Sequence, residues 1–284
     1  MTRATILFAS PDRPGLVARL SGFFAELGLN ILEASNYTEL HGDSGARFYM
    51  RLVVDLGAAT TRATMETSFE TQIATPVGGE WSIGYHDRVA RIAVLVTKDP
   101  TCLYDLALRQ KQGELPCEIA LVISNHAMLE SAAQSFRLPF YALPITKETK
   151  PQQEAQILDL LTRHDVDLVV LARYMQVLSD DFLIKAPPVI NIHHGFLPAF
   201  QGAKPYHQAH ARGVKLIGAT AHYATKDLDE GPIIEQDVAR ISHAMTPDEL
   251  VRVGRDVERV VLARAVRAHL ERRVIVEGRR TFVL

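Results

Sequence analysis

Hydrophobic and polar positions near the N-terminus alternate between the period of a strand and the period of a helix. Apolar side chains recur at helical spacing from Leu16 to Leu27, and again at Met65, Phe69 and Ile73. Four further segments have the composition of β-strands: Thr5 to Ala9, Ile31 to Glu39, Arg47 to Asp55 and Trp81 to Tyr85. The turn formers from His41 to Gly45 are expected to join the second strand to the third. This order predicts a ferredoxin-like βαββαβ unit with both helices on one face of its sheet.

The pattern changes after a short polar link at His86 to Val89. Beyond it, apolar runs typical of strands buried on both faces alternate with segments of helical period. The expected strands are Arg91 to Val96, Ile119 to Ser124, Pro139 to Leu143, Asp167 to Ala172, Val189 to His193 and Ile217 to Tyr223. The expected helices are Leu103 to Gln112, Ala127 to Phe136, Pro151 to Arg163 and one that begins near Pro205. The alternation predicts an α/β, doubly wound, Rossmann-like domain with a mostly parallel sheet, and it divides the chain into domains 1–86 and 87–284.

The C-terminal part has a clear helix start. Thr246, Pro247 and Glu249 combine an N-cap, a first-turn proline and the glutamate of a capping box. The helix is expected to run to about His269, and Val274 to Val283 to form a terminal hairpin.

Composition narrows the classes of protein that fit. Hydrophobic residues make up 47% and charged residues 23%, which is ordinary for a soluble globular protein. The net charge of −2 and the lack of a Lys/Arg block argue against nucleic-acid binding. No apolar run approaches membrane-spanning length, and Cys102 and Cys117 have neither a CxxC spacing nor a disulfide framework. We therefore expect a cytoplasmic protein with reduced cysteines and no membrane partner.

Candidate chemistry lies at the end of the strand Val189 to His193. Asn191 and His193 are two residues apart and so project to the same side of a strand, at the carboxyl edge where doubly wound sheets bind ligands. An amide donor beside an imidazole is a plausible oxyanion and acid–base pair. Asp229, in the loop after the next strand, is a candidate carboxylate partner that orients the imidazole, although an Asp-Glu-Gly-Pro segment also suits a surface turn. His222 fits a site residue and a core histidine equally well.

The N-terminal unit carries a resemblance of its own. The segment Ser10 to Val17, followed by Gly28 to Ile31, resembles the ACT domain, a small-molecule regulatory module. Gly15 would let backbone N–H groups at a helix N-terminus approach a small anionic ligand. The resemblance implies edge-to-edge pairing into a homo-oligomer and a candidate amino-acid effector near Asp12, Gly15 and Asn30. A purely structural dimerisation module is the alternative.

The second domain is similar to the folate-dependent formyltransferase family. The similarity rests on four spaced motifs: Asn191-Ile192-His193, Phe196-Leu197-Pro198, Gly202-Ala203-Lys204-Pro205-Tyr206 and Leu228-Asp229-Glu230-Gly231-Pro232-Ile233. It implies 10-formyltetrahydrofolate as substrate, with Asn191 and protonated His193 donating to an oxyanion and Asp229 positioning or deprotonating the attacking water. It also implies that folate is a substrate, with no cofactor, and the histidines show no metal-ligand spacing such as HExxH. Met175, Gln176, Val177 and Leu178 match the family's pterin slot, with His222 as a further lining residue, although Met175 and Leu178 also suit a core.

The loop after the first strand of this domain favours hydrolysis over formyl transfer. Glycinamide ribonucleotide formyltransferases hold a substrate phosphate on a glycine-rich loop there, whereas this chain has Thr97 to Leu103 without glycine. Hydrolysis would yield formate and tetrahydrofolate and supply formate for purine synthesis. Two hypotheses compete with hydrolysis. One is an amine-acceptor formyltransferase, because Lys98 could bind a substrate phosphate in place of the glycine-rich loop. The other is a non-catalytic folate or amino-acid sensor. One departure is Gly195, where the family commonly has serine, and it predicts a looser loop and reduced turnover.

Overall fold

The computed structural model describes residues 3–40, 45–57, 61–199 and 205–284. Its contacts divide the chain into two compact units. The first holds the chain up to Arg88 together with Arg272–Ile275 and Phe282–Leu284, and the second holds Val89–Glu271 with Val276–Thr281. The expected turn residues His41 to Ser44, and Gly202, Ala203 and Lys204 of the third motif, lie outside the described residues.

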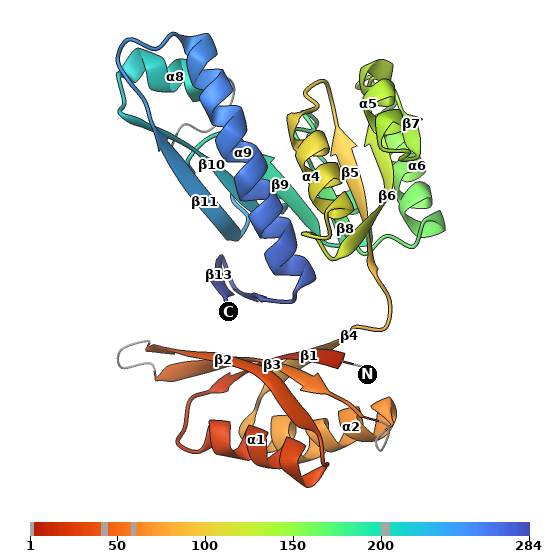
Figure 1. Ribbon diagram of the computed structural model, residues 1–284, viewed down its shortest axis with the longest axis vertical. Helices are drawn as coiled ribbons and strands as arrows, with labels where there is room; N and C mark the ends of the chain where they lie inside the picture. The colour runs from red at the N-terminus through yellow and green to blue at the C-terminus, as the bar shows by residue number, and fades with distance from the viewer. Residues whose placement is uncertain (1–2, 41–44, 58–60, 200–204) are drawn as a thin grey trace. The chain divides into compact units, whose positions relative to one another are not determined.

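The first unit has the predicted ferredoxin-like order. Its elements are β1 (Arg3–Pro11), α1 (Leu16–Glu26), β2 (Asn30–Leu40), β3 (Ala46–Asp55), α2 (Arg62–Phe69), a π-helical turn (Glu70–Ala74), α3 (Thr75–Val77) and β4 (Glu80–Tyr85). The sheet is antiparallel in the order β2-β3-β1-β4, and α1 and α2 lie on the same side of it (Figure 1). The predicted fold of this unit is therefore confirmed.

The core of this unit explains the helical and strand periods. The side chains of β3 that alternate on one face are buried against the helices: Phe48, Met50, Leu52 and Val54. Phe69 of α2 packs edge-on against Phe8 and Phe23, with ring centroids 6.1 and 5.5 Å apart. Aromatic pairs in this geometry add to the free energy gained from burying their area.

The second unit alternates strands and helices, as the sequence predicts. Its elements are β5 (Ala90–Val96), α4 (Thr101–Lys111), β6 (Cys117–Ser124), a 3-10 turn (Ala127–Leu129), α5 (Glu130–Ser135), β7 (Phe140–Ala142), α6 (Lys150–Arg163), β8 (Leu168–Leu171), α7 (Asp180–Lys185), β9 (Val189–His193), α8 (Pro205–Arg212), β10 (Leu216–Tyr223), β11 (Ile233–Arg240) and α9 (Pro247–Leu270). A terminal hairpin of β12 (Val274–Glu277) and β13 (Arg280–Val283) follows, as expected. The sequence did not predict α7 or β11.

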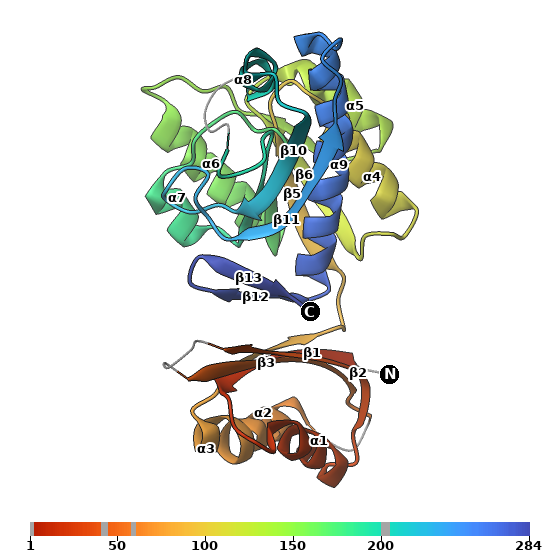
Figure 2. The same ribbon diagram turned by 90° about the vertical axis from the view of Figure 1, so that its left-hand side faces the viewer.

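The sheet of the second unit is mostly parallel and doubly wound. Its strand order is β11-β10-β9-β8-β5-β6-β7. Strand β10 pairs antiparallel with both β9 and β11, and the other pairs among the described strands are parallel. Helices α6 and α7 cover one face, while α4 and α9 lie on the other (Figure 2). The chain reverses direction across the sheet between β5 and β8, so the carboxyl ends of these strands form a topological switch point, where such folds bind ligands.

Helix α9 begins as its sequence predicts. The Thr246 hydroxyl accepts a hydrogen bond from the Glu249 N–H, and the Glu249 carboxylate accepts one from the Thr246 N–H. The helix then packs against β9, β10 and β11 and against α4. In the part of the chain that the structure describes, no helix is long and apolar enough to cross a membrane.

Candidate active site

A cavity of about 570 Å³ lies at the carboxyl edge of the second unit's sheet. Its wall includes side chains from the loop after β8, from β9 and β10, and from the loop after β10. The cavity brings together every site residue that the sequence predicts for this domain: Met175, Gln176, Val177, Leu178, Asn191, His193, His222 and Asp229. Residues up to 54 positions apart in the chain therefore meet in one space.

The end of β9 presents Asn191 and His193 to this cavity. The strand lies between β8 and β10, so its position is held from both sides. The His193 side chain is 5% exposed, and its Nδ1 lies 3.2 Å from Oδ2 of Asp229. Its other ring nitrogen, Nε2, is buried and has no hydrogen-bond partner among the described residues. A buried imidazole oriented by a carboxylate on one nitrogen thus keeps the other nitrogen for a ligand.

Asp229 reaches His193 from a loop with an unusual backbone. It has a φ of 58°, in the left-handed region that residues with a Cβ rarely adopt. Burial by itself would raise the pKa of Asp229, but the contact with His193 lowers it, and that pKa lies well below its usual value. Asp229 therefore carries a negative charge at neutral pH, and it is a partner of the imidazole rather than part of a surface turn.

His222 combines both roles that the sequence left open. It is 2% exposed, as a core residue would be, and it also lines the cavity. Its Nδ1 donates to the Tyr223 carbonyl at 2.9 Å, so Nε2 of the neutral ring is free to accept from the Asn191 amide at 3.1 Å. One amide N–H of Asn191 is thereby fixed, and the amide retains a second N–H for a ligand.

The loop that follows His193 is fastened by residues that the sequence did not single out. Fully buried Thr220 donates to the Gly195 carbonyl at 2.9 Å and accepts from the Leu197 N–H at 3.0 Å. Gln236 of β11 donates to the Thr220 hydroxyl at 2.9 Å and to the Leu197 carbonyl at 3.0 Å. A threonine hydroxyl from β10 therefore ties down the backbone of Gly195 from outside the loop. The sequence offers no local signal for this, because the three strands meet only in the folded sheet.

The proposed pterin slot has an apolar lining that faces outward. Met175 and Val177 are 58% and 56% exposed, so neither is a core residue, whereas Leu178 also packs against the core of the sheet. The Met175 N–H donates to the Thr97 hydroxyl at 2.9 Å, which joins this loop to the end of β5 across the switch point. The backbone of the loop is thus held while its side chains remain open to a ligand.

Comparisons with known proteins agree over the whole chain. A family model described as formyl transferase matches residues 90–266. A formyltetrahydrofolate deformylase from Synechocystis sp. is 50% identical over 280 residues, which cover 99% of this chain and 98% of that protein. The chain belongs to the formyltetrahydrofolate deformylase family. The crystal structure of a deformylase from Pseudomonas syringae superimposes with a TM-score of 0.93 at 44% identity and covers 100% of this chain and 95% of that one.

A second set of structures shares only the formyltransferase part of this deformylase-family chain. A glycinamide ribonucleotide transformylase from Symbiobacterium toebii matches with a TM-score of 0.66 at 31% identity, over 70% of this chain and 96% of that one. The α/β fold of the second unit is therefore common to deformylases and transformylases.

The N-terminal unit lies outside the formyl transferase match and has a cavity of its own. Gly15 caps α1 with a φ of 89°, the left-handed conformation that only glycine adopts at little cost. Gly28, which follows the C-cap of α1, has a φ of 68°. Asp12 and Gly15 both line a cavity of about 570 Å³. Asn30 is not among its lining residues, since it lies at the other end of β2 from Asn36 and Thr38, which do line it. The three predicted effector residues thus do not share one cavity within a single chain.

A bound metal ion would need several ligand side chains gathered in one place. Nowhere in residues 3–40, 45–57, 61–199 and 205–284 do three or more His, Cys, Asp or Glu side chains gather as a metal ion would require.

Two lining residues, Arg173 and Tyr206, are not among the site residues predicted from the sequence, although Tyr206 belongs to the third family motif. Arg173 has a φ of 59° directly after β8, and Tyr206 is 3% exposed at the start of α8. Both contact Glu258 of α9, which is fully buried. Apart from that motif, the only signal in the sequence was a glutamate at a position where the apolar stripe of α9 requires burial.

Proposed function

We propose that the protein hydrolyses 10-formyltetrahydrofolate to formate and tetrahydrofolate. The observation that carries the proposal is the buried, unpartnered Nε2 of His193, which lines the cavity while Nδ1 faces Asp229 at 3.2 Å. The relatives that align over almost the full chain are formyltetrahydrofolate deformylases, which supports the same substrate. Formate released in this way would be available for purine synthesis.

In the proposed reaction, the oxygen of a water molecule bonds to the formyl carbon, and the bond from that carbon to N10 breaks. N10 takes up a proton as it leaves, so the products are formate and tetrahydrofolate. The formyl oxygen becomes negatively charged on the way, and the free Asn191 N–H and the His193 Nε2–H would donate to it. Losing one donor of this kind typically lowers the rate by about 100- to 1000-fold.

Asp229 would act on both the imidazole and the water. Its Oδ2 faces His193, whereas its Oδ1 is 3.7 Å from Nε2 of His222, too far for a hydrogen bond. Oδ1 would therefore accept a hydrogen bond from the attacking water and position it. The low pKa of Asp229 supports this positioning role more than a role as a strong base. The proposed chemistry uses these side chains and water, with folate as substrate and no metal or other cofactor.

The folate would lie against the loop after β8. The exposed apolar side chains of Met175 and Val177 suit the faces of a pterin, and the polar groups of Gln176 and of the backbone suit its edges. Leu178 and His222 complete the lining near the reactive end.

The test is formate release by the purified full chain from 10-formyltetrahydrofolate without any amine acceptor. We expect equal amounts of formate and tetrahydrofolate, and a loss of about 100-fold or more for His193→Ala. His243→Ala, at an exposed residue outside the cavity, is the matched control. A wild-type protein that releases no formate would refute the activity, and an undiminished His193→Ala variant would refute the mechanism.

For the first unit we propose an ACT-type role in which the chain forms a homo-oligomer and an amino acid binds near Asp12 and Gly15. The glycine cap at the α1 N-terminus, the adjacent cavity and the exposed edge strand β2 support it. Asn30 would contribute only if a second copy brought its own β2 to the cavity. Isothermal titration with glycine, methionine and serine, together with light scattering, tests this role. A monomer that binds none of the three would exclude it.

A further inference from the structure

One side of the catalytic cavity is not used by the proposed folate site. In the proposed function, the folate and its formyl group contact the loop after β8, the ends of β9 and β10, and the loop after β10. The remaining lining residues gather near α8 and α9: Arg173, His194, Pro205, Tyr206, His207 and Val251. This second side is where any other substrate would have to approach the formyl carbon.

A buried charge network stands behind this second side. The Tyr206 hydroxyl donates to Oε1 of Glu258 at 2.6 Å, and Nη1 of Arg173 lies 3.2 Å from the Oε2 of the same carboxylate. Arg173 also lies 3.4 Å from Asp99, which pairs with Arg255 of α9 at 2.8 Å. The network therefore joins the loop after β5, the loop after β8, α8 and α9.

Three separate features of the network are unfavourable for stability. Glu258 is fully buried, and burial raises its pKa because the charged form is poorly solvated. Arg173 is in the left-handed region, which costs a residue with a Cβ about 1–2 kcal/mol. Gly254 lies inside α9, where glycine costs about 1 kcal/mol relative to alanine.

The glycine in α9 has a clear packing reason. A Cβ at position 254 would lie 2.1 Å from the Tyr206 ring, so only glycine lets that ring rest against the helix. Gly254, the left-handed backbone of Arg173 and the buried Glu258 carboxylate each lower stability. Each also places the Tyr206 ring or one of its partners. Strained and desolvated groups that converge in this way are characteristic of functional sites.

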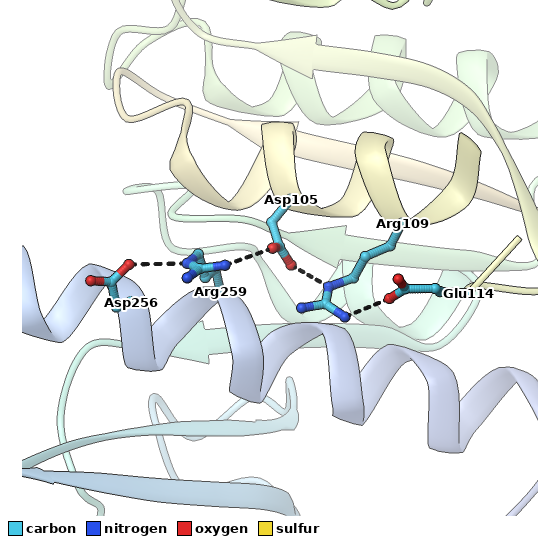
Figure 3. A network of polar contacts seen from close by, with 5 residues as sticks. All are labelled: Asp105, Arg109, Glu114, Asp256 and Arg259. Carbon is cyan, nitrogen blue, oxygen red and sulfur yellow. Dashed lines mark hydrogen bonds and ion pairs between the residues drawn. The ribbon is translucent and has the colours of Figure 1, made fainter. Parts of the chain in front are cut away.

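The helix that carries this network is itself held in place. On the surface, Arg259 of α9 binds Asp105 of α4 at 3.1 Å, and Arg109 binds Asp105 at 2.7 Å and Glu114 at 2.7 Å (Figure 3). Arg259 also binds Asp256 of its own helix at 3.1 Å. Since Arg255 and Arg259 are one turn apart, the loop after β5 and α4 are fastened to the same stretch of α9. These ion pairs tie α9, which carries Glu258 and Gly254, to α4 and to the loop after β5.

We propose that the Tyr206 ring, held by Glu258, Arg173 and Gly254, determines that the formyl group goes to water and not to an amine. The inference rests on the proposed function. A tyrosine ring backed by an ion pair occupies the space through which an amine nitrogen would reach the formyl carbon, whereas a water molecule needs far less room. Without the ring, an amine nitrogen would form the new bond to the formyl carbon and lose a proton, while the bond from that carbon to N10 breaks and N10 takes up a proton. The products would be an N-formyl amine and tetrahydrofolate instead of formate and tetrahydrofolate.

The experiment measures both fates of the formyl group with the purified full chain. 10-Formyltetrahydrofolate is supplied with and without hydroxylamine or glycinamide, and tetrahydrofolate, formate and the N-formyl amine are each quantified. Tyr206→Ala removes the ring, and Tyr206→Phe is the matched control because it keeps the ring and loses only the hydrogen bond to Glu258. Tyr104→Ala, at an exposed tyrosine of α4 outside the cavity lining, controls for the substitution itself.

For wild type, Tyr206→Phe and Tyr104→Ala we expect one formate per tetrahydrofolate even when the amine is present. For Tyr206→Ala we expect the ratio of N-formyl amine to formate to rise about tenfold or more, the scale on which a pocket discriminates by size. If Tyr206→Ala does not fold, Tyr206→Leu takes its place, with the same expected direction.

Two results overturn the inference. One is a folded Tyr206→Ala or Tyr206→Leu protein that turns over and still yields one formate per tetrahydrofolate in the presence of amine. The other is a wild-type protein that already transfers the formyl group to the amine. A wild type that releases no formate at all would instead refute the proposed function, so the two failures are distinguishable.

Discussion

His194, beside His193, should make the stability of the protein depend on pH in a defined window. Its ring centroid lies 5.4 Å from that of His193 and 6.2 Å from that of Tyr206. Burial, and then the positive charges of Arg173 and His193, lower the pKa of His194 to about 4 from its ordinary value of 6.5. The folded protein therefore keeps His194 neutral at neutral pH.

The sign and size of the effect follow from proton linkage. Between pH 6.5 and about 4, the unfolded chain binds a proton at His194 that the folded chain does not. The free energy of unfolding therefore falls as the pH falls through this window, and the loss is complete near the folded pKa. Each pH unit between the two pKa values contributes about 1.4 kcal/mol, so the full loss is about 3 kcal/mol. Asp229 has a lowered pKa and loses its contribution only below its ordinary value of 3.8, outside this window.

The assay compares wild type with His194→Gln by urea unfolding at a series of pH values. Circular dichroism is the suitable signal, because the one tryptophan, Trp81, lies in the first unit. His86 of that unit also has a lowered pKa, but it is present in both proteins and cancels in the difference. We expect the wild-type free energy of unfolding to drop by about 3 kcal/mol more than that of the variant on acidification. His243→Gln controls for the loss of one histidine, and parallel curves for wild type and His194→Gln would refute the reasoning.

Three further predictions test the site and its supports. Asp229→Asn should lower kcat by about 100-fold or more at every pH above about 5, because the low pKa of Asp229 keeps the wild-type carboxylate ionised there; steady-state kinetics that show full activity would contradict this. Thr220→Val should cost about 1–3 kcal/mol in urea unfolding and lower kcat, since it leaves buried groups of the loop after His193 without partners; an unchanged midpoint would exclude the tie. Gly254→Ala should destabilise the second unit by about 1–3 kcal/mol, because its Cβ meets the Tyr206 ring, although alanine favours helices; a rise in midpoint would show that the ring moves freely.

The elements that could be predicted from the sequence are those with a strong period. Strands such as β5 are buried on both faces and appear as continuous apolar runs, and α9 has both a capping box and an apolar stripe. Strand β11 was missed because its sequence, Ile233–Arg240, is mostly polar after two isoleucines, as expected for an edge strand that is half exposed. Helix α7 was missed because six residues hold too little periodicity to be recognised.

The candidate site also has a part that could be predicted from the sequence and a part that could not. Asn191 and His193 share one strand, so their common direction follows from the period of a strand alone. The network of Arg173, Tyr206 and Glu258 could not be predicted in this way, because its members come from three segments and meet only through tertiary packing. A left-handed backbone at an arginine also has no signature in a single sequence.

Asp229 was predicted from its motif, but its approach to His193 depends on tertiary packing. The loop that carries it shows how the motif produces that approach. The segment Leu228 to Ile233 contains turn formers and acidic residues, which by composition suit a surface turn. In the structure the chain folds back so closely that a Cβ at Gly231 would lie 1.7 Å from the Tyr223 carbonyl oxygen. The Tyr223 N–H donates to the Pro232 carbonyl at 3.0 Å, which closes the loop against β10.

With the loop closed in this way, the left-handed φ of Asp229 accompanies a side chain that is only 12% exposed and faces His193. Gly231 therefore contributes to the site without contacting it, since any side chain there would push the loop away from β10 and separate the carboxylate from the imidazole. The motif specifies the backbone path that brings the charge to the histidine as much as it specifies the charge itself.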